Sequence, residues 1–221
     1  MFNKEDVTIL IPVLNEENTI GNVIQSFKKM GYSNILVVYG NSTDNTRNIL
    51  ENSNVSWFTQ TAKGKGNAVI EGFSRINTPY TILIDADGTN NVLQADNLIE
   101  KMIKENLEHI IGNRLKHFQE NAFTKLNFIG NHIINKIFKI KTGVNMTDIL
   151  SGYRAFTLNC IKQLNLTQQN FNIEVEMSIE IAKKKIPFGV LDTYYSKRLF
   201  SKTKLKPFKD GFSIIKFILT H

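Results

Sequence analysis

The sequence predicts an α/β fold in which helices flank a mostly parallel β-sheet, and three observations lead to it. Short, almost wholly apolar segments alternate with amphipathic segments through the first half of the 221-residue chain. Unbroken apolar strands between helices are typical of parallel sheets that are buried on both faces. Hydrophobic residues make up 42% of the chain and charged residues 21%, which is ordinary globular usage and excludes a disordered or fibrous protein.

The elements of the first half follow from their residue patterns. A β-branched run over residues 7–13 predicts the first strand. Residues 19–30 carry apolar side chains at helical spacing, and Gly31 follows them as a stop. The same patterns predict strands over residues 34–39, 55–59, 80–84 and 109–112, and helices over residues 44–50, 66–76 and 95–105. Ligands of such sheets bind beyond the carboxyl ends of the strands, so we expect function in the loops that follow the strands.

The second half of the chain is less regular. Its patterns predict an amphipathic helix over residues 123–138, a polar loop over 147–154, a helix over 173–184, a strand over 190–195 and a last amphipathic helix over 208–219. No repeat or linker divides the sequence. We therefore predict one domain over residues 1–195 and an appendage over residues 196–221. The appendage is expected to contact a membrane surface or a second copy of the chain.

The chain is basic, with 27 Lys and Arg residues against 20 Asp and Glu and a net charge of +7. Such a charge suggests a polyanionic partner. Only five of the basic residues are arginines, so lysine is the default cation here. An arginine then indicates a need for planar, bidentate contacts, which draws attention to Arg114, Arg154 and Arg198. The pattern of interleaved aromatic and basic residues that marks nucleic-acid-binding modules is missing, so no nucleic acid is expected.

Cysteine usage and hydropathy restrict the cellular setting. Cys160 is the single cysteine, which excludes a disulfide framework and a multi-cysteine metal site. No apolar run approaches the ~18 residues that span a bilayer, and the first residues lack a signal-peptide pattern, so we expect a cytoplasmic protein. Between Lys197 and Lys209 the sequence is strongly basic, which favours anionic lipid headgroups. We therefore predict a peripheral protein on the cytoplasmic face of a membrane, with an ordinary solvated face as the alternative.

The strongest local motif is Asp85-Ala86-Asp87, which follows a predicted buried strand. Two carboxylates on rigid backbone are hard oxygen ligands of the kind that hold Mg²⁺ or Mn²⁺ on a diphosphate. The sequence Asp-Ala-Asp-Gly is also good turn chemistry, so a plain turn is the alternative interpretation.

Four further polar segments lie at strand ends or helix starts. Residues 63–68 bring two glycines and two lysines to a helix start that could bind an anion, or they form a flexible basic loop. Residues 40–46 could contact a nucleoside or simply cap the next helix. Residues 12–17 close the first strand with acidic residues. In residues 147–154 an Asp and an Arg flank a Ser-Gly turn, as part of a site or as a structural ion pair.

The ordered set of these segments resembles the inverting family 2 glycosyltransferases, which have the GT-A (Rossmann-like) fold. The segments that carry the resemblance are Pro-x-x-Asn-Glu at residue 12, Gly-Asn-Ser-Thr-Asp at residue 40, Gly-Lys-Gly-Asn-Ala at residue 64, and Asp85-Ala86-Asp87. Gly112-Asn113-Arg114, residues 127–135 and residues 148–156 are similar to dolichyl- and polyprenyl-phosphate sugar synthases, most of all archaeal ones. Arg198 and the Ser-Lys-Thr-Lys segment at residue 201 agree with them. The resemblance covers residues 7–215.

The resemblance implies a nucleotide-sugar site and a catalytic set. The nucleotide-sugar site would consist of Pro12, Leu14, Glu16, Tyr39, Asn41, Asp44, Lys65, Asp85, Ala86, Asp87 and Lys204. The catalytic residues would be Asp87, Asp148, Arg114 and Arg198. Asp85 and Asp87 would hold Mg²⁺ or Mn²⁺, with Asp87 favoured as the direct ligand. Arg114, Arg198 and Lys204 would face phosphates, and Asp148 would lie beside the sugar or the acceptor.

The chain departs from the family pattern at a few positions. Tyr39 stands where most members have an aspartate that contacts the nucleoside, which puts base affinity in doubt. Thr89 stands where some mannose synthases have a glutamine, and the usual glycine of the basic segment is missing. Many relatives also carry a transmembrane tail.

The resemblance implies a reaction as well as a site. A sugar would pass with inversion from a nucleotide-diphosphate sugar, a UDP-sugar being favoured over GDP-mannose, to dolichyl or polyprenyl phosphate. A phosphate monoester is mostly a dianion at neutral pH, since its second pKa is ~6, and needs no protein base. A saccharide acceptor would need one, and Asp148 would be the candidate. Further alternatives for the function are a catalytically impaired nucleotide-sugar-binding relative and a nucleotidyltransferase. The amphipathic helices could contact a membrane or form a homodimer.

Overall fold

Seven strands form one sheet in the order β3-β2-β1-β4-β6-β5-β7. The computed structural model describes residues 2–200 and 207–221 of the chain. The strands are β1 (Val7–Val13), β2 (Ile35–Tyr39), β3 (Ser56–Thr59), β4 (Tyr80–Leu83), β5 (His109–Phe118), β6 (Arg154–Thr157) and β7 (Phe188–Tyr195). The helices are α1 (Ile20–Lys29), α2 (Thr46–Glu51), α3 (Lys65–Phe73), α4 (Ala95–Lys104), α5 (Lys125–Thr142), α6 (Leu158–Gln163), α7 (Ile173–Lys183) and α8 (Pro207–Thr220), with short 3-10 turns η1 (Lys4–Asp6) and η2 (Val92–Gln94).

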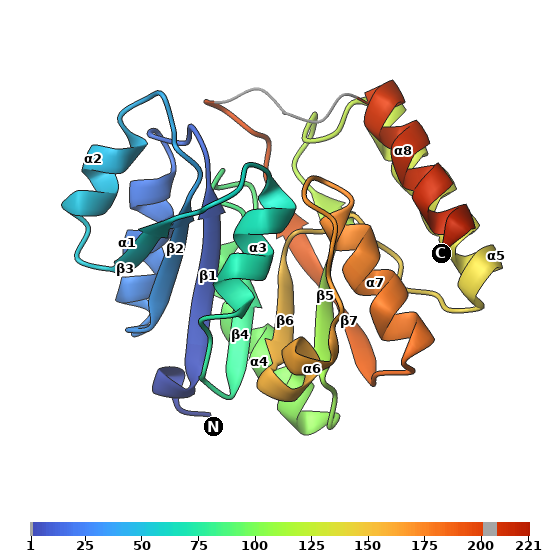
Figure 1. Cartoon of the computed structure of the whole chain (residues 1–221), viewed down its shortest axis with the longest axis horizontal. Helices are drawn as coiled ribbons and strands as arrows, with labels where there is room; N and C mark the ends of the chain where they lie inside the picture. The colour runs from blue at the N-terminus through green and yellow to red at the C-terminus, as the bar shows by residue number, and fades with distance from the viewer. Residues whose placement is uncertain (1, 201–206) are drawn as a thin grey trace.

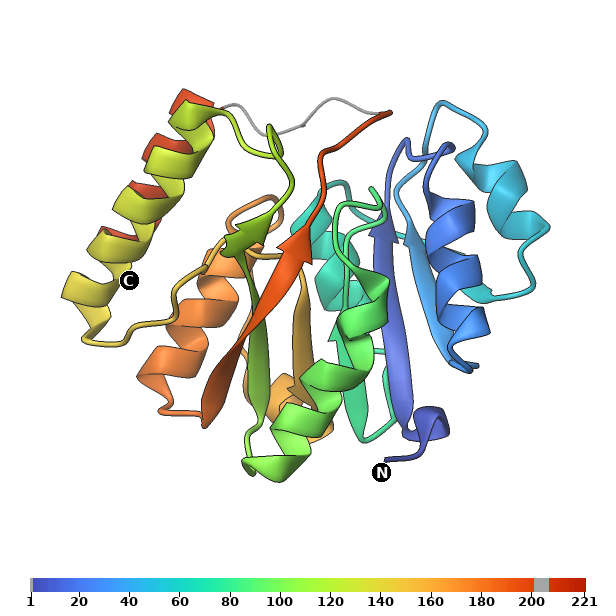
Figure 2. The same cartoon turned by 180° about the vertical axis from the view of Figure 1, so that it is seen from behind.

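Strand β1 lies inside the parallel half of the sheet and is buried on both faces. It pairs in parallel with β2 on one side and with β4 on the other. Its alternate side chains enter two hydrophobic cores: Leu10 joins the core with α3, and Ile9 and Ile11 join the core with α1 and α4. The first core lies on the face covered by α3, α6 and α7 (Figure 1), and the second lies on the opposite face (Figure 2). This two-sided burial explains the unbroken apolar run of the strand.

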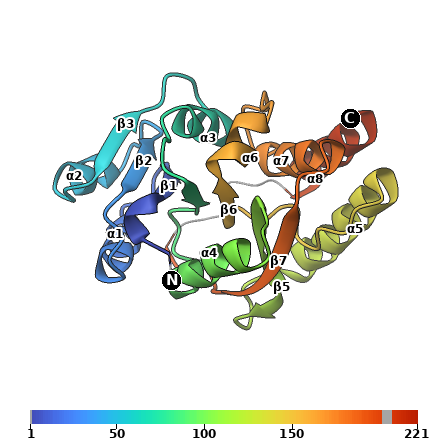
Figure 3. The same cartoon turned by 90° about the horizontal axis from the view of Figure 1, so that it is seen from below.

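Helices α5 and α8 lie side by side at one edge of the molecule (Figures 2 and 3). Ile214, Phe217 and Ile218 of α8 are buried in the same core as α7. The described part of the predicted appendage therefore packs on the domain, and the boundary at residue 195 stays a prediction.

The fold class is confirmed, and the strands β5 and β6 differ from the expectation. Strand β5 runs six residues beyond the predicted residues 109–112, because its polar outer half pairs with β7 alone and stays partly exposed. Strand β6 and helix α6 were not predicted. Strand β6 has the sequence Arg-Ala-Phe-Thr and runs antiparallel between β4 and β5, so it lacks the apolar run that predicted the neighbouring strands.

Within residues 2–200 and 207–221, no helix is long and apolar enough to cross a membrane.

Candidate active site

A cleft of about 1270 Å³ opens beyond the carboxyl ends of β1, β2 and β4 and reaches helices α5 and α8. Residues after each of these strands line it, among them Asn15, Asn41 and Asp85. The polar loops that the sequence analysis singled out thus meet in one hollow, as expected for a parallel sheet. Of the predicted site residues, those that line the cleft are Pro12, Leu14, Glu16, Asn41, Lys65, Asp85, Ala86, Asp87, Arg114 and Arg198.

Asp85 and Asp87 face the cleft with different surroundings. The side chain of Asp87 is only 4% exposed, and its Oδ1 accepts hydrogen bonds from the backbone N–H (3.0 Å) and the hydroxyl (2.6 Å) of Thr89. Its Oδ2 pairs with the guanidinium of Arg198. The side chain of Asp85 is 28% exposed, and its Oδ1 lies 2.5 Å from Nζ of Lys65. Each carboxylate therefore has a cation of the chain beside it.

Lys65 connects Asp85 to a second acidic residue, Glu174, at the start of α7. Its Nζ lies 2.6 Å from Oε1 of Glu174, which is buried. Burial by itself would lower the pKa of Lys65, but attraction to the two carboxylates outweighs burial and raises the pKa. Burial would likewise raise the pKa of Asp85, and the ammonium of Lys65 reverses that and holds the pKa below its usual value. Lys65 and Asp85 are therefore both charged at neutral pH.

Gly64 and Gly66 allow the start of α3 to pack closely against the backbone of residues 168–169. The first N–H groups of the helix are hydrogen-bonded there. The N–H groups of Gly66 and Asn67 donate to the carbonyl of Gln169, at 2.8 and 3.3 Å. Gly64 has a φ of +114° and also lies against this carbonyl. The anion-binding interpretation of this helix start is therefore wrong for these amides, because a loop far along the chain occupies them. The close backbone approach that the glycines suggested is real.

We expect Gly66→Ala to destabilise the protein strongly. A Cβ at this position would lie 1.8 Å from the carbonyl oxygen of Gln168, so backbone must move. The cost should be at least ~2 kcal/mol in the free energy of unfolding, measured by urea denaturation. Gly21→Ala in α1 is the matched control, because its Cβ would make only an ordinary 3.5 Å contact, and it should not destabilise. Equal stabilities of the two variants would contradict this packing.

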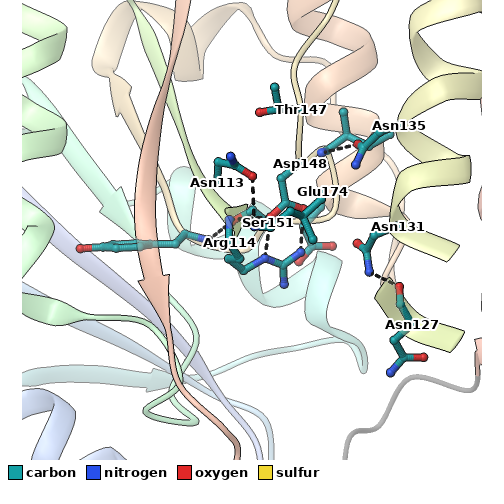
Figure 4. Close-up of polar contacts among 12 residues, drawn as sticks. Asn113, Arg114, Asn127, Asn131, Asn135, Thr147, Asp148, Ser151 and Glu174 are labelled. Atoms are coloured by element: carbon teal, nitrogen blue, oxygen red, sulfur yellow. Dashed lines mark hydrogen bonds and ion pairs between the residues drawn. The ribbon is translucent and has the colours of Figure 1, made fainter. Parts of the chain in front are cut away.

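Arg114 and Asp148 form a buried bidentate ion pair at the other side of the cleft (Figure 4). Nε and Nη2 of Arg114 each donate to one carboxylate oxygen of Asp148 at 2.8 Å, and the backbone N–H of Arg114 donates at 3.0 Å. Asp148 is fully buried. Burial would lower the pKa of Arg114, but Asp148 raises it. Arg114 therefore makes the bidentate contact expected of an arginine. Its partner is a carboxylate of the protein, which binds one edge of the guanidinium.

The loop that carries Asp148 is held by Asn135 of α5 and by Arg154 of β6. Thr147 has a φ of +59°, a strained value for a β-branched residue. The N–H of Ile149 donates to Oδ1 of Asn135 on α5 (Figure 4). Buried Arg154 donates to the carbonyls of Ile149 and Glu174. Burial lowers the pKa of Arg154 to about 10, so it stays charged at neutral pH. Arg154 therefore joins the loop of Asp148 to the helix of Glu174, in place of the Asp148–Arg154 pair that was one expectation.

Arg198 spans the cleft from the segment after β7. Its Nη2 pairs with Asp87 and its Nη1 lies 3.4 Å from Oε1 of Glu16, which is buried behind β1. The loops after β1 and β4 are thereby joined through one guanidinium. This is the bridging task for which an arginine suits better than a lysine.

The lining of the cleft does not include three of the predicted residues that the structure describes, Tyr39, Asp44 and Asp148. Tyr39 is buried against Trp57, with ring centroids 5.9 Å apart, and its hydroxyl donates to the carbonyl of Ser42. Asp44 accepts from the N–H groups of Glu17 and of Thr46, the first residue of α2. Lys204 lies outside the described residues. The alternation along β2 places Tyr39 together with Val37 in the core that α1 and α4 share, so the tyrosine at this position packs in that core.

Two residues of the site were not chosen from the sequence. In the sequence, Glu174 is an acidic residue at a helix start. Its partner Lys65 is 109 residues away along the chain. Thr89 stands out only as a departure from glutamine, and it holds Asp87. A local signal exists in both cases, but the partners could not be found without the fold.

The acidic residues fit a divalent cation that is shared with a diphosphate. Within the described part of the chain there is no group of three or more His, Cys, Asp or Glu residues that could hold an ion alone. Mg²⁺ is commonly bound by one or two carboxylates together with substrate phosphates. Asp85 and Asp87 supply two such carboxylates at the rim of the cleft.

Comparison with known sequences finds a family model and relatives that match this chain. Residues 8–164 match the family model described as glycosyl transferase family 2. The chain is 40% identical over 213 residues to glycosyltransferase AglJ of Haloferax volcanii, covering 96% of this chain and 70% of that protein. It is 27% identical over 209 residues to the UDP-N-acetylglucosamine–dolichyl-phosphate N-acetylglucosaminyltransferase of Methanococcus voltae, covering 83% and 82% of the two chains.

Comparison with solved structures supports the fold. Glucosyl-3-phosphoglycerate synthase from Mycobacterium tuberculosis, in complex with Mn²⁺ and UDP-glucose, superposes with a TM-score of 0.74 at 16% identity. The match covers 96% of this chain and 76% of that one.

Proposed function

Because the chain belongs to glycosyl transferase family 2, we propose that it transfers a sugar with inversion from a nucleotide-diphosphate sugar to dolichyl or polyprenyl phosphate. The observation that carries the proposal is the two-sided chemistry of the cleft. Its sheet side presents Asp85, Asp87 and the two arginines. Its helix side presents apolar side chains of α5 and α8. A charged donor and a hydrocarbon acceptor could therefore meet in one site.

The apolar wall is the feature that favours a lipid acceptor over a saccharide. It consists of Leu126, Ile133 and Ile134 from α5 and Phe212, Ile214 and Ile215 from α8. A hydrocarbon chain against these side chains would gain ~0.8 kcal/mol for each buried CH₂ group. A saccharide acceptor would leave its hydroxyl groups unpaired against the same wall, which is unfavourable.

The residues suit attack by a phosphate on the anomeric carbon. The lipid phosphate is mostly a dianion at neutral pH and can attack without a protein base. Arg114 and Arg198 would hold phosphate oxygens in the forked geometry that lysine lacks. Asp148 is occupied by Arg114, which favours a role in orienting that guanidinium over a role as base. A single in-line displacement inverts the anomeric centre and releases the nucleoside diphosphate.

A divalent cation, Mg²⁺ or Mn²⁺, would be held by Asp85 and Asp87 and would neutralise charge on the diphosphate as a Lewis acid. Lys65 would add a fixed positive charge beside it, since Glu174 retains the ammonium when Asp85 takes another partner. The mycobacterial synthase forms a complex with Mn²⁺ and UDP-glucose, and the Methanococcus voltae protein is named for a UDP-sugar and dolichyl phosphate. Both support a UDP-sugar as the donor here, with GDP-mannose as the alternative.

The proposal is tested by extraction of labelled sugar into an organic phase. Purified protein is incubated with Mn²⁺ or Mg²⁺, a short dolichyl phosphate and one radiolabelled nucleotide sugar at a time. We expect metal-dependent label in the organic phase with one donor. Label that appears only on an added saccharide would overturn the lipid acceptor. No transfer to any acceptor by folded protein that still binds UDP would favour an impaired, binding-only relative.

We further propose that α5 holds the protein on the cytoplasmic face of a membrane. Leu126, Ile129, Ile133 and Ile140 form one apolar stripe along this helix. Leu126 and Ile133 also line the cleft, whereas Ile129 and Ile140 do not line it and are 57% and 75% exposed. Exposed lysines of the same helix lie beside the stripe. An apolar stripe flanked by cations is typical of helices that lie in an anionic lipid interface.

Replacing Ile129 and Ile140 with serine should weaken binding to anionic dolichyl-phosphate vesicles roughly 10-fold or more, measured by sedimentation. Leu93→Ser is the matched control, since Leu93 is 71% exposed on η2, away from α5, and should bind normally. Unchanged vesicle binding by the double variant would sink the membrane proposal. A dimer that becomes a monomer in the double variant would assign the stripe to a second copy instead.

A further inference from the structure

Thr89 makes three polar contacts that converge on the acidic end of the cleft. Its hydroxyl and its backbone N–H both donate to Oδ1 of Asp87, at 2.6 and 3.0 Å. Its carbonyl accepts from the N–H of Ser196 at 2.7 Å. Thr89 is only 1% exposed and does not line the cleft. It is thus a buried residue that acts on its neighbours.

The two donations decide which oxygen of Asp87 faces the cleft. An ionised carboxylate only accepts hydrogen bonds, so the Thr89 hydroxyl must be the donor, and a short bond to a charged acceptor is a strong one. Oδ1 is engaged by Thr89 from within the loop after β4. Oδ2 is the oxygen that points to Arg198.

The carbonyl of Thr89 also holds the segment that carries Arg198, the cation that pairs with Asp87. Ser196 follows β7 directly and precedes Arg198 by two residues. The isolated bridge between Asn90 and Tyr195 lies next to this hydrogen bond. The turn at Thr89 therefore holds both Asp87 and the segment that delivers Arg198.

We propose that Thr89 is a positioning residue that directs Oδ2 of Asp87 toward the metal and diphosphate and places Arg198 opposite it, without touching the metal itself. The inference rests on the proposed function for the identity of the ligand. It differs from that function in assigning the orientation of the carboxylate to one hydroxyl. Partners that orient a ligating carboxylate typically change metal affinity 10- to 100-fold when they are removed.

Two substitutions at Thr89 and one control test the proposal. Thr89→Val removes the hydroxyl and keeps the shape and the backbone bonds, and Thr89→Ser keeps the hydroxyl. Thr81→Val in β4 is the control, because Thr81 is fully buried and its hydroxyl has no hydrogen-bond partner within the described residues. The readout is the dissociation constant of Mn²⁺ in the presence of UDP, followed by electron paramagnetic resonance of the free ion. Thermal unfolding checks that each variant is folded.

We expect Thr89→Val to weaken Mn²⁺ binding roughly tenfold or more, while Thr89→Ser and Thr81→Val stay within about twofold of the parent. Binding of UDP without metal should be unchanged in all three variants. Normal Mn²⁺ binding by Thr89→Val would overturn the inference, and so would an equal loss in Thr89→Ser. If the parent protein does not bind Mn²⁺ with UDP, the metal assignment of the proposed function fails and the inference fails with it. If Mn²⁺ binding behaves as expected but no sugar reaches the lipid, only the proposed acceptor fails.

Discussion

Asp87→Asn is expected to lower the rate of sugar transfer by about 10³-fold or more. The amide keeps the shape of the side chain but removes the negative charge from the buried carboxylate, whose exposed fraction is only 4%. A neutral oxygen is a poor ligand for a divalent cation, so the charge on the leaving diphosphate would lose its main compensation. A loss of this size corresponds to about 4 kcal/mol of transition-state stabilisation. The measurement is single-turnover transfer at saturating donor.

Two controls make the Asp87 result specific. Asp192→Asn removes a carboxylate from β7 that pairs with Lys116 at 2.6 Å outside the cleft, and should transfer sugar at the parental rate. Asp85→Asn should be slower than the parent but faster than Asp87→Asn, because Asp85 is more exposed and shares Lys65 with Glu174. Transfer by Asp87→Asn at more than a tenth of the parental rate would exclude Asp87 as the main metal ligand.

Glu174→Gln should reduce both stability and turnover. The substitution leaves the partly buried ammonium of Lys65 with Asp85 as its one remaining carboxylate among the described residues, so the site cannot keep Lys65 in place once Asp85 binds a cation. Breaking one side of a buried ion pair costs roughly 3 kcal/mol in the free energy of unfolding. We expect turnover to fall about 10- to 100-fold, with most of the effect on kcat, because Lys65 would stabilise the departing diphosphate.

Glu180→Gln is the matched control for Glu174→Gln. It makes the same chemical change on the same helix and also removes a lysine partner, Lys184 at 2.7 Å, but the side chain of Glu180 is more exposed than that of Glu174, 15% against 5%. Its effect on stability should be within about 1 kcal/mol, with no effect on turnover. Equal turnover of the two variants would show that Lys65 needs no second carboxylate.

The charge network also predicts how stability depends on pH. The native pKa of Asp85 is lowered, so its stabilising contribution is present above its unfolded pKa of ~4 and is lost as the pH falls below it. The native pKa of Lys65 is raised, so its contribution is present below ~10 and is lost only at higher pH. This network should therefore leave stability flat between about pH 5 and pH 9, and in Glu174→Gln the same flat region should lie lower. Urea denaturation across this pH range measures both.

The sequence by itself determined the α/β fold and the loops that form the site. Apolar strands and amphipathic helices are local patterns that arise from burial on one or two faces, so periodicity located most of the elements within a few residues. The loops after β1, β2 and β4 could be assigned to one edge of the sheet because parallel strands end there together. The motif order in those loops was sufficient for the family.

Only the tertiary structure decided what each residue of those loops contacts. The pairs Lys65–Glu174 and Arg198–Asp87 join segments more than 100 residues apart, and no local pattern encodes them. The short antiparallel β6 depends on its two neighbours in the sheet for its existence. Tyr39 belongs to the core and not to the cleft because the pleat of β2 decides which face its side chain takes. Local sequence specifies elements through repeated short-range interactions, whereas a site is made of single long-range contacts that exist only after the chain has folded.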